Sequence, residues 1–127
     1  LWVTVILGLT GKGGDWEEHI LKTAELINKM KPRHLSAMTL GAAKGTPLGD
    51  DVLAGRFVMA EPQQILEECR LLIEKLDVDP LHFTSNHASN YLPLKGGLPE
   101  DREKFLSAID QALEGKIRLR KPLDRGI

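Results

Sequence analysis

The chain has 127 residues, enough for one domain or for part of a larger one. Its 17 basic and 18 acidic residues are well mixed and give a formal net charge of -1 at pH 7, which argues against a charge-driven nucleic-acid or membrane surface. Cys69 is the only cysteine, so no internal disulfide can form. There is also no signal-peptide pattern and no apolar run of about 18 residues, so the sequence predicts a cytoplasmic protein without a membrane segment.

Strand-like and helix-like patterns alternate along the chain. The first strand is expected at residues 2–9 (WVTVILGL), whose nearly continuous apolar character is typical of a strand covered on both faces. A helix is expected at 15–31, because apolar residues recur there at helical spacing. The remaining elements are expected, in order, as a strand, a helix, a strand and a helix at 34–40, 62–76, 81–86 and 99–115.

This order predicts an α/β fold of three βα units with parallel strands. Three units cannot close a barrel, so the chain is expected to form half of a partial (β/α)6 TIM-like barrel, with a small three-layer domain as the alternative. The half-barrel is assigned to residues 1–115 and an irregular extension to 116–127. The start at Leu1 rather than Met indicates a cut through a longer protein, although an N-terminal tail would look the same.

Long, glycine-rich or polar loops follow each predicted strand, whereas the connections from helix to strand are short. The loops contain GLTGKGGD (8–15), LGAAKGTPLGDDV (40–52) and SNHASNY (85–91). Ligands of parallel α/β proteins bind at the carboxyl ends of the strands, so these loops are candidate ligand contacts. Each also has a structural interpretation: a turn and helix cap, a rigid turn that starts a short helix at Asp50, and a loop capped by its own Asn side chains.

Other reactive residues give no recognisable site. Cys69 lies on the apolar stripe of the second helix, which indicates core packing rather than catalysis. The four histidines lack zinc-site spacing, and neither a nucleophile elbow nor a catalytic triad is present. The residues alone therefore predict an α/β barrel fragment with a ligand-binding face.

Three stretches carry a resemblance to a known family. GTPL follows one strand, SNHASNYLPLKGGLPEDREKFLSAID follows the next, and LRKPLDRGI ends the chain. Together they resemble the carboxyl-terminal part of radical S-adenosylmethionine proteins, in particular a bacterial group of unknown substrate. The resemblance covers nearly the whole chain, and SNHASNYLPLKG is its most specific part.

The resemblance implies a parent enzyme that holds a [4Fe–4S] cluster and cleaves S-adenosylmethionine reductively to a 5′-deoxyadenosyl radical. The three-cysteine loop that binds the cluster in this family is absent, as is the Gly-Gly-Glu motif, so the fragment alone is expected to be inactive and to bind neither cofactor. By position, the resemblance assigns the following residues to S-adenosylmethionine or substrate contacts: Gly8, Thr10, Gly45, Thr46, Ser85, Asn86, His87 and Asn90.

The implied partners are the missing N-terminal half-barrel and a substrate, small or otherwise unknown. An isolated half is expected to form a homodimer or a higher oligomer through its exposed sheet edges. Two alternatives stay open: another TIM-barrel enzyme, of the aldolase or phosphate-binding type, and a stand-alone, non-catalytic domain that binds a partner.

Overall fold

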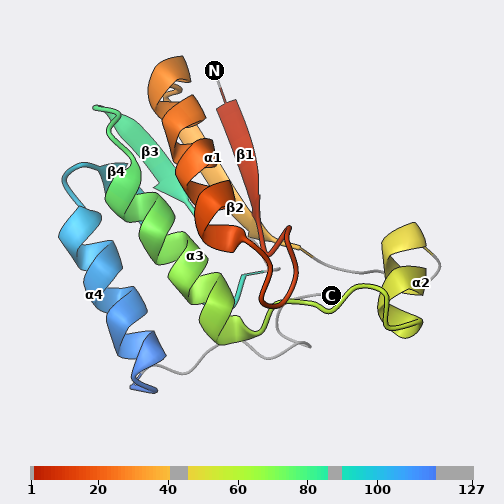
Figure 1. The fold of residues 1–127 in the computed structure, drawn as a ribbon. Coiled ribbons are helices and arrows are strands. Elements are labelled where there is room, and N and C mark those ends of the chain that lie inside the picture. Colours follow the sequence, from red (N-terminus) through yellow and green to blue (C-terminus); the bar gives the residue numbers. More distant parts are fainter. Residues whose placement is uncertain (1, 41–45, 86–89, 117–127) are drawn as a thin grey trace.

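The computed structural model describes residues 2–40, 46–85 and 90–116, and Figure 1 shows their arrangement. The elements are, in chain order, β1 (Trp2–Leu7), α1 (Trp16–Met30), β2 (His34–Thr39), α2 (Pro47–Leu53), α3 (Pro62–Lys75), β3 (Leu81–Thr84), β4 (Lys95–Leu98) and α4 (Arg102–Leu113). The predicted strands and helices all form, most of them slightly shorter than expected. The predicted extension falls outside the described residues except for Lys116.

The strands form one sheet in the order β1-β2-β3-β4. β1, β2 and β3 are parallel, which confirms an α/β fold with a mainly parallel sheet. β4 pairs antiparallel with β3, so the prediction of three βα units alone is wrong at this point. The segment 95–98 was expected to be loop because it is short and contains two glycines, which disfavour strands.

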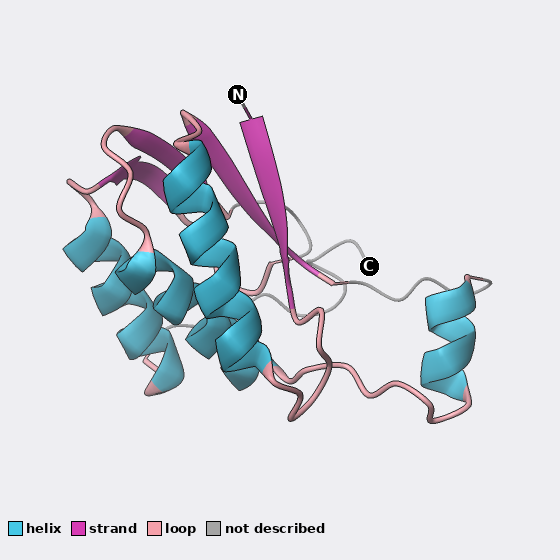
Figure 2. Cartoon of the chain, turned by 45° about the horizontal axis from the view of Figure 1, so that its top comes forward, coloured by secondary structure: helices cyan, strands magenta, loops and turns pink. Residues whose placement is uncertain are grey.

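Helices α1, α3 and α4 form one layer on one face of the sheet (Figure 2). α3 lies in the middle and contacts both α1 and α4. The core between the layers contains Leu35 and Phe83 from the sheet and Ile27, Leu72 and Ile109 from the helices, all at most 1% exposed. No described element packs on the other face, where Trp2 is 64% exposed, so the expectation that β1 is covered on both faces is wrong for this part of the chain.

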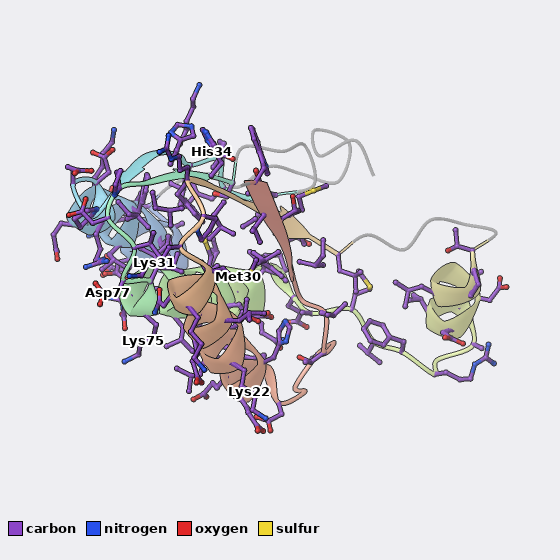
Figure 3. The ribbon with its side chains drawn as sticks, turned by 90° about the horizontal axis from the view of Figure 1, so that it is seen from above. Lys22, Met30, Lys31, His34, Lys75 and Asp77 are labelled. Carbon is purple, nitrogen blue, oxygen red and sulfur yellow. The ribbon has the colours of Figure 1, made fainter. Side chains whose placement is uncertain are left out.

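Polar side chains connect the helices to one another. Arg70 of α3 donates from Nε and Nη2 to the Asp110 carboxylate of α4, at 2.7 and 3.2 Å, and also pairs with Glu74. The hydrogen bond from Arg70 lowers the pKa of Asp110. Asn28 of α1 donates to the carbonyl of Lys75, the last residue of α3, and accepts from the amide of Asp77, two residues later; both are labelled in Figure 3.

α2 lies apart from this helix layer in both ribbon views (Figures 1 and 2). It begins at Pro47, three residues before the start suggested by the sequence, because Thr46 Oγ1 caps it by accepting from the Gly49 amide at 3.0 Å. None of the described helices combines the length and the apolar character needed to cross a membrane.

Candidate functional site

The loop after β1 is held by side chains from α3. Glu68 is fully buried and accepts a hydrogen bond from the Gly8 amide at 2.9 Å. Gln64 donates to Glu68 at 3.1 Å and to the Gly11 carbonyl at 2.9 Å, and its amide oxygen accepts from the Gly13 amide at 3.0 Å. These loop amides are therefore satisfied within the protein, as expected for a structural turn.

Two glycines in this loop cannot be replaced without strain. Gly8 has a φ of 81°, and a Cβ atom there would lie 2.7 Å from Ile65 Cδ1. Gly11 has a φ of 78°, and its Cβ would lie 2.8 Å from the Val58 carbonyl oxygen. The loop that was predicted to approach a ligand thus approaches α3 and the segment before it. Thr10, between them, has a buried hydroxyl oxygen with no hydrogen-bond partner in the described part of the chain.

Asn90 joins the carboxyl ends of β2 and β3. Its Nδ2 donates to the carbonyls of Ala37 and Ser85, both at 2.8 Å, and its Oδ1 accepts from Thr39 Oγ1 at 2.8 Å. The residue is only 3% exposed. Because the whole amide is engaged, the structure assigns Asn90 a structural role, and its assignment to a cofactor stays a prediction.

Ser85 lies on the helix side of the sheet edge. It lines a cavity of about 10 Å³ together with Leu7, Ile65 and Ile109, and its hydroxyl is buried without a partner among the described residues. A space of this size holds roughly one water molecule, so it is too small for a cofactor. Ser85 therefore does not face the open side of the sheet.

The other predicted contacts divide into two groups. Thr46 caps α2, as described above. Gly45, Asn86 and His87 lie outside the described residues, so the predicted set as a whole stays a prediction.

The open face of the sheet carries a second set of polar and aromatic side chains. Trp2 stacks on His34 with ring centroids 4.9 Å apart, and His34 meets the edge of His82 at 5.5 Å. The second row lies two residues further along β2 and β3, where Ser36 shares a hydrogen bond with Thr84 at 3.1 Å. Trp2 Nε1 donates to Ser36 Oγ, also at 3.1 Å. Two cross-strand rows thus span β1, β2 and β3.

Four residues of these rows line a groove of about 380 Å³: Trp2, His82, Ser36 and Thr84. Thr4 and Lys95 line it as well. The functional prediction from the loops missed this face. Its signal was present in the sequence, because Trp2 and Thr4, His34 and Ser36, and His82 and Thr84 each alternate with apolar residues.

The described residues contain no metal site. No group of three or more His, Cys, Asp or Glu side chains within 2–40, 46–85 and 90–116 could hold an ion. Cys69 is buried, and burial raises the pKa of its thiol to about 12, so the thiolate that a metal requires is strongly disfavoured. This agrees with the core position expected from the apolar stripe.

Searches against protein-family models, curated proteins and solved structures find no match for this chain.

Proposed function

We propose that this chain is the carboxyl-terminal part of a radical S-adenosylmethionine enzyme and that the open sheet face is the inner wall of its partial barrel. The observation that supports this is the one-sided packing of the parallel strands, with α1, α3 and α4 on one face and the two cross-strand rows on the other. Parallel strands are normally covered on both faces, so an open face indicates a missing covering element. In a half-barrel, that element is the other half.

The chain itself does not fit the iron–sulfur cluster. A [4Fe–4S] cluster in this family needs three thiolates, and the single cysteine, Cys69, is a buried thiol in the core. The cluster ligands must therefore come from residues other than these 127, in the parent polypeptide. For S-adenosylmethionine, the fit rests on Thr10, whose hydroxyl has no partner among the described residues, since the polar groups of Gly8 and Asn90 are bonded within the protein. Gly45, Asn86 and His87 stay predicted contacts.

In this proposal the described residues bind and position the substrate. Ser36, Thr84 and Lys95 offer hydrogen-bond donors along one row of the wall, and Trp2 offers a flat apolar surface. β1, at the end of the sheet order, would pair with the preceding strand of the N-terminal half-barrel. The enzyme would work in the cytoplasm, whose reducing conditions suit the cluster.

The test uses the complete polypeptide that contains these residues, purified without oxygen. We expect an iron-bearing, brown protein that releases 5′-deoxyadenosine when it is reduced in the presence of S-adenosylmethionine. A colourless protein that cleaves no S-adenosylmethionine after cluster reconstitution would contradict the proposal and favour another barrel enzyme.

A matched pair of variants tests the role of the wall. Thr84→Val removes a hydroxyl from the open face, and Thr23→Val removes one from α1, where Thr23 donates to the His19 carbonyl. Once a substrate is identified, we expect Thr84→Val to raise its KM about 5-fold or more at unchanged iron content, as loss of one hydrogen bond predicts. Thr23→Val should leave KM unchanged.

A further inference from the structure

The open face has an uneven distribution of charge. The four strands contain no Asp or Glu, whereas the face carries Lys95, His34 and His82. Lys95 forms no ion pair with any described residue. The acidic side chain of Glu100 lies over Gly97, in the row of His82 and one row away from Lys95. The face therefore favours a negatively charged group beside Lys95.

The hydroxyl row ends beside this lysine, because Thr84 is the register partner of Lys95. Trp2 Nε1 can only donate, so Ser36 Oγ accepts from it. Ser36 and Thr84 then share one further hydrogen bond, whichever of them donates. In either case one hydroxyl hydrogen of the pair remains for an outside acceptor.

The aromatic row adds a flat surface. One face of the Trp2 ring stacks on His34. Trp2 keeps 64% of its surface exposed. A flat ring placed against Trp2 would cover apolar surface that now faces solvent.

We infer that the groove binds a small molecule that combines a planar ring with a carboxylate or another oxyanion. The anion lies between Lys95 and the Ser36–Thr84 hydroxyl pair, and the ring lies against Trp2. Charge-assisted hydrogen bonds to the anion would dominate recognition. A ligand of this class would bind to the proposed barrel wall. Its identification as the enzyme's substrate rests on the proposed function, whereas its binding to the groove does not.

The experiment titrates the 127-residue chain with indole-3-acetate and with the neutral indole-3-acetamide, followed by amide chemical shifts in two-dimensional NMR spectra. We expect saturable shifts at Thr4, Ser36, Thr84 and Lys95, and a dissociation constant at least about 5-fold lower for the acetate. Equal binding of the two compounds, shifts confined to the helix layer, or no saturable shift up to about 10 mM would each overturn the inference.

Two charge variants provide the matched control. Lys95→Gln should abolish the preference for the acetate, and Lys104→Gln, which removes the same charge from α4, should keep it. If both variants keep the preference, the anion does not bind beside Lys95 and the inference fails. A parent polypeptide that releases no 5′-deoxyadenosine would refute the proposed function while leaving this binding result in place.

Discussion

Individual polar residues at the strand ends decide how this sheet is held together. Asn90 was predicted to contact a ligand because it lies in a polar loop after a strand. Its three hydrogen bonds instead tie Ala37 and Thr39 of β2 to Ser85, just after β3. A buried amide without these partners would lose its hydrogen bonds to water and gain none in return, so its full engagement explains why it is tolerated in the core.

Replacement of Asn90 tests this structural role. Asn90→Ala should lower the free energy of unfolding by about 2–4 kcal/mol, because two carbonyls and one hydroxyl each lose one hydrogen bond. Urea unfolding followed by circular dichroism measures the change. Gln63→Ala, on the exposed start of α3, should change the stability by less than about 0.5 kcal/mol. Equal stability of the two variants would refute the role of Asn90.

At the scale of elements, α3 organises much of the fold. It lies between α1 and α4, and it supplies Gln64 and Glu68 to the loop after β1. Sequence reasoning missed the buried Glu68, since an acidic residue in a helix is normally solvated. Its position directly before Cys69, on the edge of the apolar stripe, was the available signal.

The turn from β4 into α4 depends on close packing at one glycine. A Cβ atom on Gly96 would lie 2.4 Å from Asp101 Oδ2 and 2.8 Å from Phe105 Cζ, whereas one on Gly97 would lie 3.2 Å from the flexible end of Glu100. Asp101 also accepts from the Gly97 amide at 2.9 Å, which fixes the carboxylate in place. This tight corner explains why α4 begins at Arg102 rather than at Pro99.

Alanine at the two glycines gives a direct comparison. We expect Gly96→Ala to lower the free energy of unfolding by about 1–3 kcal/mol through overpacking against Phe105, and Gly97→Ala to change it by less than about 1 kcal/mol. Thermal or urea unfolding measures both. A larger loss for Gly97→Ala than for Gly96→Ala would show that the corner is not packed as described.

On the scale of the whole molecule, no described element covers the open sheet face or pairs with the outer edge of β1. β1 is a terminal strand of the sheet and carries neither proline nor charge, the features with which proteins usually protect such edges. Its outer backbone groups can pair with another strand. The predicted self-association of the chain follows from this edge.

We expect the isolated chain to associate as its concentration rises, with the sedimentation coefficient increasing toward that of a dimer. Thr4→Lys places a charge on the exposed middle of β1 and should shift association to higher concentration, about 5-fold or more, because the charge is unfavourable beside a neighbouring strand. Lys104→Gln on α4 is the control and should associate like the original chain. A monomer at every concentration tested would contradict the prediction.

The sequence by itself determined the local elements, since the helices at 16–30, 62–75 and 102–113 and the strands at 2–7 and 34–39 were predicted close to their observed bounds. Local periodicity carries this information because it decides which face of an element can be buried.

Local periodicity could not reveal β4, because 95–98 becomes a strand only by pairing with β3. Nor could it separate ligand contacts from internal ones, since Asn90 and Glu68 each bond to residues between 51 and 60 positions away as well as to nearby ones. Only the tertiary structure decided those pairings, because a polar side chain shows its role through the groups that surround it.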